Sequence, residues 1–442
     1  MSGGARDWIA TAGQPLRGRI RVPGDKSISH RAVMLGALAK GATEIRGFLE
    51  GEDTRATAAI FQQLGVRIEA PADTDRIVHG VGLHGLRGSG KALDCGNAGT
   101  GMRLLSGVLA GQVFDSVLVG DASLSKRPMR RVTEPLALMG ARIETGAEGV
   151  PPLHIRGGQS LRGIEYALPV ASAQVKSALL LAGLYASGST TISEPHPTRD
   201  YTERMLAAFG WPVEFAPGHV RLDGGHRLQA TRIDVPADFS SAAFFLVAAC
   251  VVPGSELRID AVGMNPRRIG LLQALRLMGA DIREESRREQ GGEPVADLVV
   301  RHAALHGIEV PEALVPDMID EFPALFIAAA CADGRTVIRG AAELRVKESD
   351  RIATMAAGLR TLGVVIEETP DGAVIDGRAG QGNLFDGGVI DSHGDHRIAM
   401  SFAIAAQLAR GDVRIRDTAN VATSFPGFEA LATRIGMALE IA

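Results

Sequence analysis

The chain has 442 residues, of which 45% are hydrophobic and 22% are charged, and its formal net charge is −4 at pH 7. Disordered proteins contain fewer apolar residues than this, so the composition predicts a folded globular protein. One hydrophobic core stops growing near roughly 250–300 residues, and we therefore expect two domains. The negative charge argues against nucleic acid as the main partner, because binding to a phosphate backbone needs a basic surface.

Cysteine content and hydropathy exclude further classes. Cys95, Cys250 and Cys331 are odd in number and lack CxxC spacing, so we predict neither a disulfide framework nor a zinc site. No basic start followed by an apolar core marks a signal peptide. The longest apolar stretch, 242–253, is shorter than the ~20 residues that a membrane span needs. We expect a cytoplasmic protein without a membrane partner.

The first elements in chain order form a unit that then repeats. After a strand expected at 16–22 come an apolar helix, a strand opened by Gly41, a second helix and the closing phrase LGVRIE at 64–69. Glycine is favoured where a helix ends because it tolerates a positive φ. The glycines that end the first helices are Gly41, Gly111, Gly188, Gly254, Gly334 and Gly411, and those of the closing phrases are Gly65, Gly140, Gly210, Gly279, Gly363 and Gly436. Six βαβ-type repeats fit two domains of three repeats each better than a long superhelix.

The two helices of each repeat differ in character. First helices such as 178–182 and 324–329 are apolar on all sides, which predicts burial on all sides. Second helices such as 271–278 are amphipathic and are expected outside. If the three buried helices of a domain run parallel, their amino termini share one end, where helix dipoles and free N–H groups favour an anion.

A repeated linker predicts the domain boundary. RVPGD at 21–25 precedes the first repeat and DVPAD at 234–238 precedes the fourth. Proline stiffens such a segment and ends a strand. We predict a first domain at 24–236, a second domain of 1–23 plus 237–442, and a double hinge near 22–25 and 235–238, which suits closure around a ligand.

The repeats diverge at the starts of their helices, where most carry polar or charged residues. Cations there oppose the helix dipole, and a bound polyanion with phosphates and carboxylates resolves this conflict. The candidate residues are Lys26, Ser27, Arg31, Arg127, Arg199, Lys347, Arg351 and Arg397. The fourth repeat offers only Phe239, Ser240 and Ser241, without a basic group. Singly, each of these cations is as well explained by a solvated surface.

Three further patterns are rejected as sites. GLRGSGKA at 85–92 nearly matches a phosphate-binding loop, but it has Ala92 in place of Ser or Thr and no helix pattern follows. The glycines of 96–101 lack the setting of a dinucleotide fingerprint. His393 and His396 have no evident third ligand, and Arg397 adds a cation, so we expect no metal.

Seven motifs follow one another along the chain: GDKSISHR (24–31), GNAGT (96–100), GDASLSKRPM (120–129), SAQVKSA (172–178), IDEFP (319–323), ELRVKESDR (343–351) and DHRIAMS (395–401). Together they resemble one family over about 16–437, the 3-phosphoshikimate 1-carboxyvinyltransferases, or EPSP synthases. SAQVKSA and VATSFP (421–426) are more similar to the class II branch. The resemblance implies a two-domain inside-out α/β barrel, shikimate 3-phosphate and phosphoenolpyruvate as substrates, no cofactor and no metal. We also expect a monomer.

The resemblance also implies roles for single residues. Those implied to contact shikimate 3-phosphate are Ser27, Arg31, Ser172, Ala173, Gln174, Arg199, Asp320 and Lys347. Those implied to hold phosphoenolpyruvate are Lys26, Gly99, Arg127, Gln174, Arg351 and Arg397. Asp320 is the candidate base at the 5-hydroxyl, Glu348 the candidate proton donor and acceptor at C3, and Lys26 an acid or base beside the bridging oxygen.

Some residues depart from the family pattern. Thr423 stands where many relatives have lysine, so one phosphoenolpyruvate contact is expected to be missing. Leu104 replaces a common proline, and Ala173 stands where some relatives have serine. Gly99 leaves room that an alanine would fill.

Two alternatives stay open at this point. The sister enolpyruvyl transferase acting on UDP-N-acetylglucosamine relies on a reactive cysteine in a mobile loop, whereas 120–131 contains none. A non-catalytic repeat scaffold would have no need of Asp320 and Glu348 among the cationic helix starts.

Overall fold

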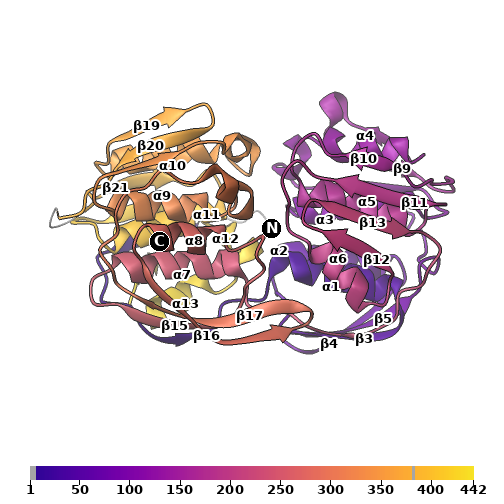
Figure 1. Ribbon diagram of the computed structural model, residues 1–442, viewed down its shortest axis with the longest axis horizontal. Helices are drawn as coiled ribbons and strands as arrows, with labels where there is room; N and C mark the ends of the chain where they lie inside the picture. Colours follow the sequence, from indigo (N-terminus) through magenta and orange to yellow (C-terminus); the bar gives the residue numbers. More distant parts are fainter. Residues whose placement is uncertain (1–5, 381–383) are drawn as a thin grey trace. The chain divides into compact units, whose positions relative to one another are not determined.

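The computed structural model describes residues 6–380 and 384–442 (Figure 1). The chain divides into two compact units, which we call central and terminal. The central unit is Gly24–Pro236 with Glu289–Glu293. The terminal unit runs up to Pro23 and continues over Ala237–Arg288 and Pro294–Ala442. The short piece Glu289–Glu293 is the tip of a hairpin, and the sequence analysis did not assign it to the central unit.

In the central unit, three first helices each pack against a sheet of their own, and three further helices lie outside them. The first helices are α1 (Lys26–Leu38), α3 (Gly99–Ala110) and α5 (Ala173–Gly183), and the outer ones are α2 (Glu52–Gln63), α4 (Arg130–Leu138) and α6 (Tyr201–Ala208). The strands are β3 (Lys40–Arg46), β4 (Arg67–Ala72), β5 (Asp75–Val81), β6 (Leu93–Asp94), β7 (Ser116–Val119), β8 (Arg142–Thr145), β9 (Leu153–Arg156), β10 (Glu165–Ala167), β11 (Ser189–Ser193), β12 (Val213–Ala216), β13 (His219–Asp223) and β14 (Arg232–Asp234). Their sheet orders are β14-β3-β5-β4, β6-β7-β9-β8 and β10-β11-β13-β12.

The terminal unit repeats this plan. Its first helices are α7 (Phe239–Val251), α9 (Phe322–Cys331) and α11 (His396–Ala406), and the others are α8 (Gly270–Leu277), α10 (Arg351–Thr361), α12 (Val421–Ser424) and α13 (Phe428–Arg434). The strands are β1 (Trp8–Thr11), β2 (Arg17–Ile20), β15 (Glu256–Gly263), β16 (Asp281–Gln290), β17 (Glu293–Arg301), β18 (Arg335–Ile338), β19 (Ile366–Thr369), β20 (Gly372–Asp376), β21 (Gly388–Asp391), β22 (Val413–Arg416) and β23 (Ala438–Ile441). Their sheet orders are β16-β17-β15-β2, β18-β20-β19 and β21-β22-β1-β23.

Burial follows the predicted helix types. Every residue of α7, α9 and α11 is buried. These helices lie together in Figure 1 and pack against one another. They also pack against β15, β20 and β22 respectively. In the amphipathic α8 the side chain of Leu275 is fully buried, whereas that of Leu277 is 50% exposed. Each unit has its own hydrophobic core. The predicted α/β architecture of buried helices surrounded by sheets is therefore confirmed.

The glycines of the six closing phrases all have a positive φ, between +78° and +113°. Only glycine adopts this backbone region without strain, so each phrase can turn from helix to strand. Among the glycines that end first helices, Gly111 and Gly411 differ from expectation, because neither has a positive φ. Gly111 ends α3 with φ −88°. A side chain there would collide with Tyr185, so close packing accounts for this glycine.

The chain passes between the units at two linkers, at residues 23–24 and 236–237, and again on both sides of Glu289–Glu293. In the central unit, Asp25 N donates to Pro236 O at 2.9 Å, and in the terminal unit Asp238 N donates to Pro23 O at 2.9 Å. β2 pairs in parallel with β15, which places the amino-terminal strand in the terminal unit. Movement at these linkers stays a prediction. In the part of the chain that the structure describes, no helix is both long and apolar enough to cross a membrane.

Candidate active site

The start of α1 in the central unit carries the first predicted cation. Asp25 caps this helix by accepting from Ile28 N at 2.8 Å, and its other oxygen accepts from the Tyr201 hydroxyl at 3.0 Å. Lys26 Nζ lies 2.9 Å from Asp53 Oδ2. A helix start disfavours a cation, and the Asp53 carboxylate offsets this cost.

Arg31 lies one turn further along α1 and is 4% exposed. Its guanidinium donates to Thr202 Oγ1 at 2.7 Å, to Ser177 Oγ at 2.8 Å and to Ser27 O at 2.9 Å. Burial, followed by the charge of Arg199, lowers the pKa of Arg31 to about 10. Arg31 is thus cationic at neutral pH, and it is close enough to Arg199 for the two charges to repel.

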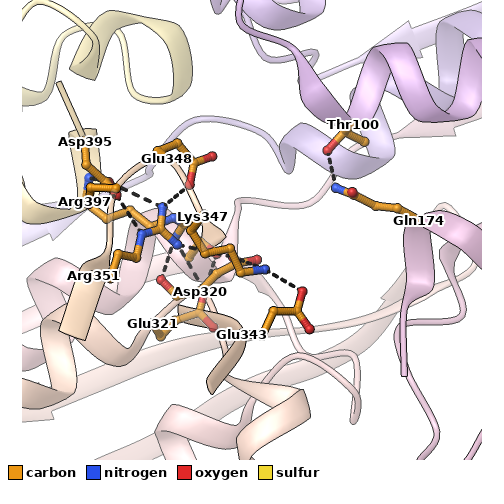
Figure 2. Close-up of polar contacts among 12 residues, drawn as sticks. Thr100, Gln174, Asp320, Glu321, Glu343, Lys347, Glu348, Arg351, Asp395 and Arg397 are labelled. Carbon is orange, nitrogen blue, oxygen red and sulfur yellow. Dashed lines mark hydrogen bonds and ion pairs between the residues drawn. The ribbon is translucent and has the colours of Figure 1, made fainter. Parts of the chain in front are cut away.

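Helices α3 and α5 meet through Gln174. Its Nε2 donates to Thr100 Oγ1 at 2.8 Å, as Figure 2 shows, and its Oε1 accepts from Arg103 Nη1 at 2.8 Å. Ser172 caps α5, with Oγ accepting from Val175 N at 3.4 Å. Gln174 is thereby held in one orientation at the helix start.

Gly99 opens α3 beside two guanidinium groups. A Cβ at Gly99 would lie 3.1 Å from Nη1 of Arg103 and 3.1 Å from Nη1 of Arg127. Arg127 donates in turn to Asn97 Oδ1 at 2.8 Å and to Ser123 Oγ at 3.2 Å. The glycine therefore allows these cations to approach the helix start closely.

Arg351 is the centre of the predicted site in the terminal unit, where it is 1% exposed (Figure 2). Its Nε lies 2.8 Å from Asp395 Oδ2, its Nη2 2.6 Å from Glu348 Oε2 and its Nη1 3.6 Å from Asp320 Oδ1. Burial alone would lower the pKa of Arg351, but Asp395 and Glu348 outweigh it and the pKa is raised. One permanent cation thus links both carboxylates predicted to act in proton transfer.

Asp320 also meets the two other predicted cations of this unit. Lys347 Nζ lies 3.9 Å from Asp320 Oδ1 and 3.0 Å from Glu343 Oε1. Arg397 Nη1 donates to the Asp320 carbonyl at 3.0 Å and lies 3.6 Å from Glu321 Oε1. The predicted residues of the terminal unit therefore form one continuous polar cluster.

The helix start of the fourth repeat has no basic residue of its own, but it has a basic partner from elsewhere in the chain. Arg268, 5% exposed, donates to Ser240 Oγ and lies 3.9 Å from Asp238 Oδ1. It also lies 3.4 Å from Asp320 Oδ2. Sequence reasoning missed Arg268 because it precedes α8 and belongs to none of the helix-start motifs.

The structure also describes the patterns rejected as sites and the departure from the family pattern at Thr423. The strand β6, and not a helix, comes directly after 85–92. Among residues 6–380 and 384–442, no group of three His, Cys, Asp or Glu side chains could hold a metal ion. Thr423 lies in α12, and its Oγ1 donates to Asn420 O at 2.7 Å.

The predicted site residues belong to two sets, one in each unit. The central set is Lys26, Ser27, Arg31, Gly99, Arg127, Ser172, Ala173, Gln174 and Arg199, and the terminal set is Asp320, Lys347, Glu348, Arg351 and Arg397. In the terminal set, Asp320 meets Lys347, Arg351 and Arg397, which come from the fifth and sixth repeats. In the central set, Arg31 and Gln174 contact side chains of other repeats that were not predicted as site residues.

Comparison with known proteins adds independent evidence. Residues 10–431 match the EPSP synthase (3-phosphoshikimate 1-carboxyvinyltransferase) family. The chain is 69% identical to a 3-phosphoshikimate 1-carboxyvinyltransferase of Xanthomonas axonopodis pv. citri, over 100% of this chain and 99% of that protein. A second protein of this name, from Xanthomonas euvesicatoria pv. vesicatoria, is 68% identical with the same coverage.

Solved structures agree with the sequence relatives. An EPSP synthase from Acinetobacter baumannii has a TM-score of 0.89 and 53% identity, covering 99% of this chain and 100% of that one. The enolpyruvyl transferase NikO from Streptomyces tendae has a TM-score of 0.79 at 18% identity, covering 99% of each chain, and so shares the fold. The chain belongs to the EPSP synthase family.

Proposed function

We propose that Lys26, Asp320 and Glu348 carry the proton transfers of the EPSP synthase reaction in this chain. That reaction transfers the enolpyruvyl group of phosphoenolpyruvate to the 5-hydroxyl of shikimate 3-phosphate and releases phosphate, and it belongs to aromatic amino acid biosynthesis. Membership of the family decides between the three functions that the sequence left open. The alternatives of a sugar-nucleotide transferase and a non-catalytic scaffold are set aside.

The observation that carries the assignment is the position of Arg351. Its guanidinium contacts Glu348 at 2.6 Å and Asp320 at 3.6 Å. A positioned acid or base must lie within reach of the proton that it moves, and a rigid buried cation holds both carboxylates in place. Arg351 can also neutralise negative charge that develops on the phosphoenolpyruvate side.

The addition step needs one base and one acid. Asp320 accepts the proton of the 5-hydroxyl while the oxygen of that hydroxyl bonds to C2 of phosphoenolpyruvate. At the same time Glu348 donates a proton to C3. A tetrahedral intermediate results.

The elimination step reverses the proton transfer at C3. Glu348 removes a proton from C3, the C2–C3 double bond forms again, and the bond from C2 to the phosphate oxygen breaks. Lys26 acts beside that bridging oxygen as the phosphate leaves. Arg127 and Arg397 supply further positive charge for the departing group.

The residues proposed to bind each substrate are those that the family motifs imply. Shikimate 3-phosphate is bound by Ser27, Arg31, Ser172, Ala173, Gln174, Arg199, Asp320 and Lys347, and phosphoenolpyruvate by Lys26, Gly99, Arg127, Gln174, Arg351 and Arg397. The clustered cations suit two phosphates and two carboxylates. All of these residues belong to one chain, so we propose that a monomer is sufficient for catalysis; activity that disappears on dilution would argue for an oligomer.

Isotope exchange at C3 tests the assignment of Glu348. In ²H₂O the proton donated to C3 is a deuteron, so recovered phosphoenolpyruvate and product should contain deuterium in the vinyl group. Glu348→Gln should slow both this exchange and phosphate release by at least ~10². Glu343→Gln, which alters a neighbouring carboxylate that contacts Lys347, is the control. Normal exchange in Glu348→Gln would remove Glu348 from the mechanism.

A further inference from the structure

A buried cluster of three charges lies beside the central set but contains none of its members. Lys176, in the second turn of α5, has Nζ 2.8 Å from Glu194 Oε2 and 2.8 Å from Glu203 Oε1. The three side chains are only 2–3% exposed. Burial lowers the pKa of Lys176, but Glu203 and Glu194 outweigh it, so the pKa is raised and the lysine is charged.

Glu194 connects this cluster to the loop that carries Arg199. Residues 194–200 join β11 to α6 and contain Pro195 and Pro197. Glu194 Oε2 accepts from Thr198 N at 3.2 Å, and Oε1 accepts from Thr198 Oγ1. Lys176 Nζ donates to Thr198 O at 3.5 Å. The peptide groups on both sides of Thr198 are therefore held, directly before Arg199.

Glu203 provides an internal comparison because it lies in α6 and, unlike Glu194, has no hydrogen bond to Thr198 among those recorded for the described residues. Burial raises the pKa of Glu203, although the charge of Lys176 opposes this effect. Glu194 and Glu203 thus contact the same lysine at the same distance, and both are buried. They differ in that Glu194 fixes the backbone that leads into Arg199.

A contribution to stability does not by itself explain such a cluster. Desolvation of buried charges often cancels their attraction, so a buried ion pair is weak evidence for stability. An ion pair between α5 and the loop does restrict where Arg199 can lie. Arg199 stands near enough to Arg31 to lower its pKa, after the larger effect of burial. A bound phosphate dianion would relieve the repulsion between these two cations.

We propose that the Lys176–Glu194 ion pair positions Arg199 to bind the phosphate of shikimate 3-phosphate. This rests on the proposed assignment of Arg199 to that substrate. Lys176 and Glu194 are positioning residues that act through Arg199 and touch neither substrate. Their loss should therefore weaken binding of shikimate 3-phosphate much more than binding of phosphoenolpyruvate.

The test compares Glu194→Gln with the matched control Glu203→Gln. We expect Glu194→Gln to raise KM and the calorimetric Kd for shikimate 3-phosphate about tenfold, with KM for phosphoenolpyruvate changed less than about threefold. Glu203→Gln should change both KM values less than about threefold. If the cluster had only a structural role, Glu194→Gln and Glu203→Gln would change the KM values alike. That result would overturn the proposal.

Two further variants complete the design. Thr198→Val removes only the hydroxyl bond to Glu194 and, like Glu194→Gln, should raise KM for shikimate 3-phosphate. If Glu194→Gln does not fold, Thr198→Val tests the proposal in its place. Arg199→Ala tests the assignment beneath the proposal: an unchanged KM for shikimate 3-phosphate refutes that assignment. If Arg199→Ala raises this KM, adding Glu194→Gln should raise it no further. If the rise in KM of the double variant were instead the product of the two single rises, Glu194 would not act through Arg199.

Discussion

Arg351 and Asp395 form an ion pair in which neither side chain is more than 1% exposed, with Nε 2.8 Å from Oδ2. Asp395 also caps α11, because its Oδ1 accepts from Arg397 N at 2.9 Å. One carboxylate thus fixes both Arg351 and the helix start that carries Arg397. The positions of Arg351 and Arg397 in the proposed site of the terminal unit therefore depend on the buried side chain of Asp395.

Asp395→Asn should therefore lower stability as well as activity. Removing one partner of a buried pair costs about 3–5 kcal/mol of unfolding free energy when the remaining charge has no other partner. Because Arg351 keeps Glu348 and Asp320 as partners, we expect a smaller loss of about 2–3 kcal/mol. The exposed pair Arg335–Asp376, with Nε 2.7 Å from Oδ1, is the control, and Asp376→Asn should cost about 0–1 kcal/mol. Urea unfolding measures both variants. Equal losses would show that burial of the Arg351 pair is unimportant.

Asp320→Ala should separate binding from turnover. The variant removes the proposed base but leaves Arg351, Arg397 and Lys347 in place. We expect Kd for shikimate 3-phosphate to stay within about tenfold, while kcat for phosphate release falls by at least ~10². Near-normal turnover would remove Asp320 from the mechanism.

Gly99→Ala should weaken phosphoenolpyruvate binding. The added Cβ would lie 3.1 Å from Nη1 of Arg127, so the guanidinium must move by a few tenths of an ångström. We expect KM for phosphoenolpyruvate to rise about tenfold and KM for shikimate 3-phosphate to change much less. Gly411→Ala adds a Cβ whose nearest neighbour is 3.4 Å away, and steady-state kinetics should not distinguish it from the parent.

His30 should make stability depend on pH. Burial, with smaller effects of Lys26 and Arg31, lowers its pKa to about 3, while Nδ1 lies 2.8 Å from Thr57 Oγ1. The folded pKa is below the unfolded value of about 6.5, so this contribution is present above pH ~6.5 and is lost as the pH falls from there toward the folded pKa. The slope from this residue is at most about 1.4 kcal/mol per pH unit.

His30→Asn tests this expectation by keeping a polar group near Thr57 without the titration. Its unfolding free energy, measured between pH 7 and 4.5, should fall less steeply than that of the parent, although its absolute stability is lower. His219→Asn, at an exposed position of β13, should keep the parental slope. An identical slope in His30→Asn would contradict the burial of a neutral His30.

The sequence by itself determined the repeat, the helix types and the family. Local chemistry explains this success. A helix that is apolar on all sides, such as α9, must be buried, and a glycine such as Gly279 with φ +94° is required wherever the chain turns in the left-handed region. The motifs placed the candidate site residues at helix starts, because helix capping uses residues that are neighbours in the chain.

Only the tertiary structure decided which charges meet. Arg268 reaches Ser240 across 28 positions, Arg351 reaches Asp395 across 44, and Lys176 reaches Glu194 across 18. The hairpin tip Glu289–Glu293 belongs to the central unit, although strands β16 and β17, which it connects, are part of a sheet of the terminal unit. No local pattern encodes such pairs, because the packing of separate segments sets their distance. Burial then determines their strength, by removing the water that would otherwise screen each charge.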